Sequence, residues 1–410
     1  MTPRTLVLRS LRHRRLATAL SALSVALGVG LVVGIGTLRR EARSHFQNAA
    51  VSFDLVVGPK ASPLQIVLYT VFQMDEAPGT IPVSAYERLR ADPRVKVALP
   101  WVVGDSYREF RIVGTSEAFF GQEVRGGVPV ACASGVPFRP FDPARREWEA
   151  VLGSTVAAET GLRAHDTFSA VHGLDSKGTG TEHEEAPWRV VGVLAPTGTP
   201  VDRAIWIHWE AFFAMERHDP TAGRGAGAER RISAVVLKAA NPAFANLLFF
   251  ELRSSEDLQP ARPFVEVRRL FDIVGNADRL LLAVAALVVV VAALGILVSM
   301  ASGMRERRRD LAMMRALGAP RRLLAALMVA EAGTVGLFGA AGGWLLGHGI
   351  VAAGASVLTE WSGVRVRTLA FAPEEILVVA GAVGLCALAG LLPAVMAYRA
   401  DVATGLAPES

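Results

Sequence analysis

Four long apolar runs divide this chain, and each is long enough to cross a membrane as a helix. They cover residues 16–38, 280–302, 323–357 and 376–398, and a helix needs about 20 residues to span a hydrocarbon core. The third run has 35 residues, so as a single helix it would be roughly 52 Å long. We therefore expect its first turns, including Glu331, to lie at or below the inner membrane boundary.

The placement of arginine orients these spans. Short arginine-rich segments stay on the cytoplasmic side of a membrane, and such segments precede the first run and separate the second from the third. Both termini are therefore expected in the cytoplasm of a bacterial cell, below its inner membrane. A cleaved signal peptide is the alternative for the first run, but its 23 uncharged residues exceed the usual core of about 7–15, and no A-x-A site follows it. This favours a retained anchor.

The long segment between the first two spans, residues 39–278, has the pattern of an α+β domain outside the membrane. Short apolar or β-branched runs alternate with helical patterns and with Gly- and Pro-rich turns. The predicted strands are 53–57, 95–103, 189–194, 204–207 and 232–237, and the predicted helices are 84–91, 154–160, 209–217, 241–253 and 265–278.

Local signals add detail to this picture. Ser84 and Glu87 have the spacing of a capping box at a helix start. Gly-rich, charged hairpins are expected near residues 173–187 and 219–231. In the first span, a set of small residues suits close packing against another helix; these are Gly28, Gly30, Gly34 and Gly36.

A short basic segment, residues 305–318, separates the second span from the third and has the features of a distinct helix. Leu311, Met314 and Leu317 share one helix face. Gly318 suits a left-handed cap, and the proline two residues later prevents the helix from continuing. An anchor loop that only orients the protein is the simpler interpretation, but the apolar face and the definite end favour a docking helix. Such a helix, joined to two spans, can pass a push from a partner into the membrane, as in a transporter permease.

Composition supports a mixed protein with spans and one aqueous domain. Hydrophobic residues make up 51% of the chain, which is more than an ordinary soluble domain carries. The net charge of +5 comes from arginines beside the spans, where they orient the protein and contact membrane lipids. No nucleic-acid-reading module accompanies this charge, so nucleic acid is not an expected partner. Cys132 is predicted outside and Cys386 within a span, so neither a disulfide nor a Cys-based zinc site is expected.

The basic segment also carries a family resemblance. Residues Glu306-Arg-Arg-Arg-Asp-Leu-Ala-Met-Met-Arg-Ala-Leu-Gly-Ala319 resemble the segment RERRREIGLLRALGA of the FtsX/MacB-like ABC transporter permeases. The resemblance extends to Glu331-Ala332, to Pro393-Ala394 and to the tail Tyr398-Arg-Ala-Asp-Val402. The tail departs from the family's common Pro-Val-Glu-Ala-Leu closure, because it reads Val-Ala-Thr-Gly-Leu.

This resemblance implies the organisation of the whole chain. Residues 1–38 would form the cytoplasmic N-terminus and first span, residues 39–278 the extracytoplasmic domain, and residues 279–410 an FtsX-like domain with three spans. It further implies a non-catalytic subunit that forms a homodimer and pairs with a separate cytoplasmic ATPase, which would bind the ATP. A periplasmic or substrate-binding partner is a further expectation.

The resemblance assigns contact with that ATPase to the basic segment. The chain has no Walker A motif of its own, since the nearest stretch, Gly173-Leu-Asp-Ser-Lys-Gly178-Thr179, has Thr where the lysine should stand. The residues expected to couple to the ATPase are Arg305, Glu306, Arg307, Arg308, Arg309, Asp310, Leu311, Met314, Arg315, Leu317 and Gly318.

A cluster of histidine and acidic residues in the predicted domain outside the membrane raises the question of zinc. Imidazole and carboxylate are zinc-type ligands, and the candidate ligands are His172, Asp175, His183 and His208. Their spacing fits no compact motif, so a solvated hairpin is the simpler interpretation and zinc the alternative.

Two function classes remain open from the sequence. A permease subunit would export a substrate or transmit mechanical work across the membrane. A membrane receptor would sense a ligand through its outer domain without transport. A receptor is expected to carry a cytoplasmic output domain, and no predicted inner segment is long enough for one, which favours the permease.

Overall fold

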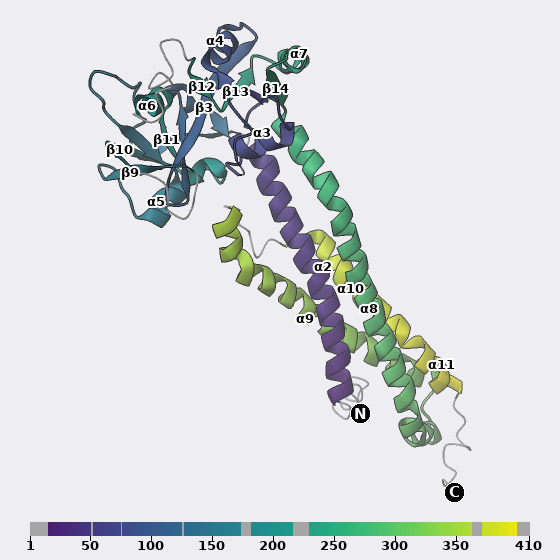
Figure 1. The fold of residues 1–410 in the computed structure, drawn as a ribbon. Coiled ribbons are helices and arrows are strands. Elements are labelled where there is room, and N and C mark those ends of the chain that lie inside the picture. Colours follow the sequence, from purple (N-terminus) through teal and green to yellow (C-terminus); the bar gives the residue numbers. More distant parts are fainter. Residues whose placement is uncertain are drawn as a thin grey trace. The chain divides into compact units, whose positions relative to one another are not determined.

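The computed structural model describes residues 15–50, 52–74, 76–124, 127–173, 182–215, 229–362 and 371–399. Within these ranges it leaves out the side chains of residues 45, 182–185, 274, 276–278, 303–312, 356–362, 397 and 399. The chain divides into two units, shown in Figure 1. The membrane unit comprises Met1–Ala42 and Val274–Ser410, and the α+β domain comprises Arg43–Ile273.

Short strands and helices alternate in the α+β domain, as the sequence predicted. Its strands are β1 Leu55–Pro59, β2 Ile81–Pro82, β3 Val95–Tyr107, β4 Phe110–Thr115, β5 Glu123–Val124, β6 Val128–Pro129, β7 Cys132–Gly135, β8 Glu149–Leu152, β9 Thr167–His172, β10 Glu182–Leu194, β11 Ala204–His208, β12 Arg231–Ile232, β13 Ala234–Ala239 and β14 Leu258–Ala261. Its helices are α3 Pro63–Thr70, α4 Val83–Ala91, α5 Ser154–Thr160, α6 Trp209–Ala214 and α7 Pro242–Arg253, with the 3-10 turns η1 Glu117–Phe119 and η2 Pro200–Arg203.

A mixed ten-stranded sheet forms the centre of this domain. Its order is β14-β1-β13-β3-β4-β11-β8-β10-β7, and β9 pairs with both β10 and β3. The pairs β4–β11 and β8–β10 are parallel. β9 and β10 are the two strands of the hairpin predicted near residues 173–187. The hairpin predicted near residues 219–231 lies mostly outside the described residues.

Both faces of the sheet are buried, because successive side chains of a strand point to opposite faces. In β1, Leu55 and Val57 belong to one apolar cluster and Val56 to the other. Helices α4, α6 and α7 contribute to the first cluster, and α3 and η1 contribute to the second. The domain is therefore a sheet with helices on both sides.

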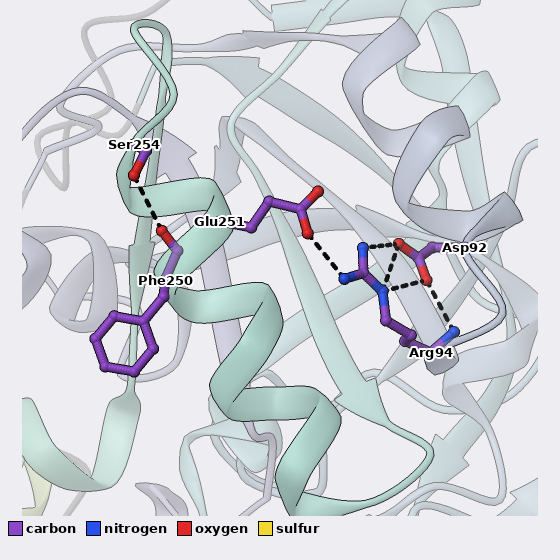
Figure 2. Close-up of polar contacts among 5 residues, drawn as sticks. All are labelled: Asp92, Arg94, Phe250, Glu251 and Ser254. Atoms are coloured by element: carbon purple, nitrogen blue, oxygen red, sulfur yellow. Dashed lines mark hydrogen bonds and ion pairs between the residues drawn. The ribbon is translucent and has the colours of Figure 1, made fainter.

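Arg94 fixes helix α7 to the turn that follows α4. Figure 2 shows its guanidinium between two carboxylates: Nη2 donates to Asp92 Oδ2 at 2.6 Å, and Nη1 donates to Glu251 Oε2 at 2.8 Å. The hydrogen bond from Arg94 holds the pKa of Asp92 below its ordinary value. Phe250, on the same helix as Glu251, is exposed.

The capping box predicted at Ser84 is wrong. Strand β2 runs directly into α4, so Pro82 is the N-cap residue and has no side-chain cap. Ser84 lies inside the first turn, and its N–H lies 3.4 Å from Glu229 Oε1. The carboxylate of Glu229, which is distant in sequence, therefore contacts the N–H of Ser84 in place of the expected Glu87.

Among the described helices of the membrane unit, four stretches are long and apolar enough to cross a membrane, which confirms the predicted number of spans. They are Arg15–Ala50, Arg279–Ser302, Arg321–Ala355 and Pro373–Met396. The helices themselves are α2 Arg15–Ala50, α8 Pro263–Ala316, α9 Arg321–Ser362, α10 Pro373–Ala389 and α11 Leu391–Arg399.

The fourth span is not one continuous helix, in contrast to the prediction. It breaks at Gly390, between α10 and α11. Pro393 has no N–H to donate to the preceding turn, and proline is tolerated only near the start of a helix. Gly390 also lies close to α9, because a Cβ at this position would be 2.7 Å from Ala332 Cβ.

Helices α2 and α9 approach each other through glycines. A Cβ at Gly343 would lie 2.5 Å from the carbonyl oxygen of Ala26, and one at Gly347 would lie 2.8 Å from that of Gly30. Small residues spaced four apart allow this close packing of helix backbones. The predicted packing role of the α2 glycines is confirmed for Gly30, which approaches α9, and for Gly28, which approaches Val289 of α8.

Candidate functional site

The basic segment forms the last part of α8 and is not a separate helix. Helix α8 is continuous over 54 residues, from Pro263 to Ala316. The helix continues through Ser302 and Gly303, at the junction of the second span and the basic segment, and no proline interrupts it there. The basic segment and the second span are therefore parts of one helix.

The predicted end of this helix is confirmed in detail. Gly318 has φ +94°, a left-handed conformation that glycine adopts without a Cβ penalty. The N–H of Ala319 donates to Met314 O at 3.0 Å, and the N–H of Gly318 donates to Arg315 O at 2.9 Å. These two bonds form a Schellman motif, after which α9 starts at Arg321. The turn between the two helices is short and well defined.

The apolar residues of the segment have different surroundings. Leu317 is 88% exposed, whereas Met314 packs against Leu324, Leu327 and Met328 near the start of α9. The side chains of the other predicted coupling residues, from Arg305 to Leu311, lie outside the described part of the chain. Of the three residues predicted on the docking face, Leu317 is thus the one shown to be accessible.

A polar cluster that the sequence did not predict lies within the membrane unit. It consists of Arg40 on α2, Trp344 and His348 on α9, and Glu375 in the first turn of α10; we call it the Glu375 cluster. Glu375 is 3% exposed. Its Oε1 accepts a hydrogen bond from Arg40 Nη2, and its Oε2 accepts one from Trp344 Nε1 at 2.8 Å.

His348 completes this cluster. Its Nε2 lies 3.0 Å from Glu375 Oε2, and its side chain is 5% exposed. Arg40 also donates to Thr37 Oγ1, one turn earlier on α2, at 3.0 Å. One carboxylate therefore joins three helices. The signal available in the sequence was local: His348 is the one titratable residue between Ala332 and Thr359, four positions after Trp344, and Glu375 directly precedes the next run.

An apolar groove of about 420 Å³ adjoins the Glu375 cluster. Trp344 and Glu375 form part of its wall. The remaining lining residues are apolar: Ala341, Leu345, Phe371, Ile376 and Val379. Elsewhere in the membrane unit, Glu331 is also buried, beside Thr18, Ser21 and Ser299 at a cavity of about 20 Å³.

The structure places only part of the predicted zinc site. His172 ends β9, and its Nδ1 lies 3.4 Å from Oδ1 of Asp105, a fully buried carboxylate on β3. Asp175 and the side chain of His183 lie outside the described residues. Within the described residues no group of three or more His, Cys, Asp or Glu side chains is arranged to hold a metal ion. Zinc takes three or four protein ligands, so the described pair is incomplete and zinc binding stays a prediction.

His208, the fourth predicted zinc ligand, has a local structural role. It is the N-cap of α6, where its Nδ1 accepts a hydrogen bond from the N–H of Glu210 at 3.4 Å. Its Nε2 lies 3.5 Å from Glu117 Oε2. Burial lowers the pKa of His208, and the nearby carboxylates of Glu210 and Glu117 oppose this shift. Burial therefore favours the neutral imidazole, and one of its nitrogens is already used by the helix.

Two family models match this chain. The model described as the MacB-like periplasmic core domain matches residues 18–262, and the model described as the FtsX-like permease C-terminal domain matches residues 282–402. The first match alone covers more than half of the chain, and together they include the α+β domain and the spans. The comparison with curated proteins found no match.

Two solved structures are similar to part of the chain. The periplasmic region of MacB from Actinobacillus actinomycetemcomitans is 12% identical, with 54% of this chain and 94% of that chain covered and a TM-score of 0.35. The extracellular domain of the noncanonic ABC-type transporter YknZ from Gram-positive bacteria is 13% identical, with 51% and 98% covered and a TM-score of 0.28.

Proposed function

We propose that this chain, which belongs to the family of FtsX- and MacB-like permeases, couples the cycle of a separate cytoplasmic ATPase to substrate export or mechanical work outside the inner membrane. Members of this family are permease components of ABC transporters and are generally non-catalytic. ATP would accordingly be bound by the partner, and the chain itself would need no cofactor.

The observation that supports coupling most directly is the continuity of α8. A helix that contains both the second span and the basic segment, and that ends in a defined cap before α9, is a stiff connection. A partner that displaces the segment would move both adjoining spans. The residues proposed to contact this partner are those of the segment from Arg305 to Gly318, with Leu317 as the exposed apolar contact.

The proposed assembly contains two copies of this chain with the ATPase. The family has ABC ATPases as partners. The proposal adds a homodimer, a periplasmic or substrate-binding partner, and a cytoplasmic position of both termini. Arginines beside the spans would contact lipid headgroups, and no nucleic acid is expected as a partner.

Replacing Leu317 by aspartate should separate the chain from its ATPase. Placing an unpaired carboxylate in an apolar contact is costly, and a cost of about 1.4 kcal/mol already corresponds to a tenfold change in affinity. The measurement is the amount of ATPase that co-purifies with the tagged full chain in detergent, and we expect it to fall by more than about tenfold.

Val136→Asp is the matched control for this experiment. Val136 is also an exposed apolar residue, 60% accessible, but it belongs to the α+β domain. The control should recover as much ATPase as the parent chain. Equal recovery with Leu317→Asp would show that the segment is only an anchor, and the absence of any ATPase from the parent complex would favour the receptor instead.

A further inference from the structure

The carboxylate of Glu375 is buried, so hydrogen bonds from the protein must replace those it would make to water. Ionisable residues within membrane spans are rare, face the interior of the bundle, and indicate a functional site by default. Glu375 is 3% exposed; its Oε1 accepts a hydrogen bond from Arg40, and its Oε2 accepts one from Trp344 and lies 3.0 Å from His348 Nε2. Removing one partner of a buried charge is costly because the other charge stays buried and unpaired.

These contacts hold three helices in one arrangement. A hydrogen bond weakens steeply when its distance or angle leaves a narrow range, so the cluster adds a directional constraint to the close glycine packing between α2 and α9. The Glu375 cluster is therefore a contact through which α2 is made to follow α9 and α10.

Along the chain, the Glu375 cluster connects the helix that follows the basic segment with the helix that leads into the α+β domain. Helix α9 starts at Arg321, directly after the cap of the basic segment. His348 lies 27 residues further along the same helix, about 40 Å at 1.5 Å per residue. Arg40 lies ten residues before the end of α2 at Ala50, and the last turns of α2 already belong to the α+β domain.

We propose that Glu375 is a positioning residue of the coupling cycle: through Arg40 it makes α2 move with α9 and α10, and thereby passes the motion of the basic segment to the α+β domain. This inference rests on the proposed function, because it requires an ATPase that moves the segment. It adds a residue that neither the basic segment nor the sequence motifs identify.

The experiment measures whether ATP changes the α+β domain. The full chain is reconstituted with its ATPase in liposomes, and hydrogen exchange of the α+β domain is recorded with and without ATP. Glu375→Gln keeps the size of the side chain but removes its charge. We expect the ATP-dependent change in exchange to fall at least about fivefold, the lower end of typical coupling between sites.

Glu374→Gln is the matched control. Glu374 precedes Glu375 in the same helical turn, loses the same charge on substitution, and is exposed. It should keep the ATP-dependent change of the parent. An equal loss in this control would overturn the proposal, because the loss would then follow from charge near the start of α10 rather than from the cluster.

Arg40→Gln keeps the test decisive if Glu375→Gln does not fold. The Arg40 side chain is 37% exposed, so its replacement disturbs packing less. It should produce the same loss, and the double variant should lose no more than either single variant, since both remove one interaction. Thermal unfolding of each variant in detergent reports whether it is folded.

The outcomes separate this inference from the proposed function. If the folded Arg40 and Glu375 variants keep the full ATP-dependent change while Leu317→Asp loses the ATPase, the inference is overturned and the proposed function stands. If the parent chain binds no ATPase, the proposed function fails and this inference fails with it.

Discussion

Burial decides what individual titratable residues do in this protein. His208 and Glu375 are similarly buried, but burial lowers the pKa of His208, which caps a helix, whereas Glu375 accepts hydrogen bonds from residues on two other helices. Asp105 is fully buried beside His172 and was not recognised in the sequence. Residue type and spacing alone did not distinguish these environments, because each is created by strands or helices from distant parts of the chain.

Replacing His208 by asparagine should remove part of the pH dependence of stability of the α+β domain. Burial lowers the pKa of His208 in the folded state. In the unfolded chain the pKa of this histidine is about 6.5. As the pH falls through this window the unfolded state binds more protons, so the parent loses stability. Asparagine does not titrate and is itself a good N-cap.

The measurement is thermal unfolding of the full chain in detergent, monitored by tryptophan fluorescence, between about pH 5 and 8. At the upper end of this range the difference between the melting temperatures of parent and variant should be constant. As the pH falls, the melting temperature of the parent should decrease relative to that of the variant. Parallel curves over the whole range would contradict a lowered pKa of His208.

At the scale of the elements, glycines determine how closely the spans pack. Gly339, Gly343 and Gly347 are spaced four apart on α9 and face α2. Their positions leave no room for a Cβ without movement of one helix. The same geometry brings α9 close enough to α2 for Arg40 to reach Glu375, on the neighbouring α10.

Gly343→Ala should destabilise the membrane unit by about 1–3 kcal/mol, the usual cost of overpacking. The added Cβ would lie 2.5 Å from the carbonyl oxygen of Ala26, a backbone atom that cannot turn away. The measurement is the melting temperature of the full chain in detergent. Gly349→Ala is the control on the same helix, because a Cβ there meets nothing within 4 Å; an equal effect of both substitutions would contradict the close contact.

For the whole molecule, two helices connect the units. Helix α2 leaves the membrane unit and ends in the α+β domain, and α8 starts in the α+β domain and ends in the basic segment. Both ends of the α+β domain are thus linked to spans by continuous helix.

The orientation of these units can be tested by labelling. In a chain without its native cysteines (Cys132→Ser, Cys386→Ala), a cysteine at Val136 should react with an impermeant reagent in intact cells, because it is exposed in the α+β domain. A cysteine at Leu317, also exposed, should react only after the membrane is opened, since arginine-rich segments stay inside. Labelling at Leu317 in sealed cells would contradict this orientation.

The sequence by itself determined the number of spans, the presence of an α+β domain between the first two, and the end of the basic segment at Gly318. Each depends on a property of neighbouring residues: the length of an apolar run, an alternating pattern, or a glycine followed by a proline. The same local signals were insufficient where distant residues compete, as at Ser84, whose N–H lies near Glu229 instead of the expected Glu87.

Only the tertiary structure decided which of these elements act together. The continuity of α8 through the basic segment, the fit of the α9 glycines against α2, and the Glu375 cluster all involve contacts or geometry that no local pattern encodes. Arg40 and Glu375 are 335 positions apart. Glu375 is removed from water and needs a partner there, which Arg40 supplies while remaining 37% exposed, and this arrangement exists only after the spans have packed.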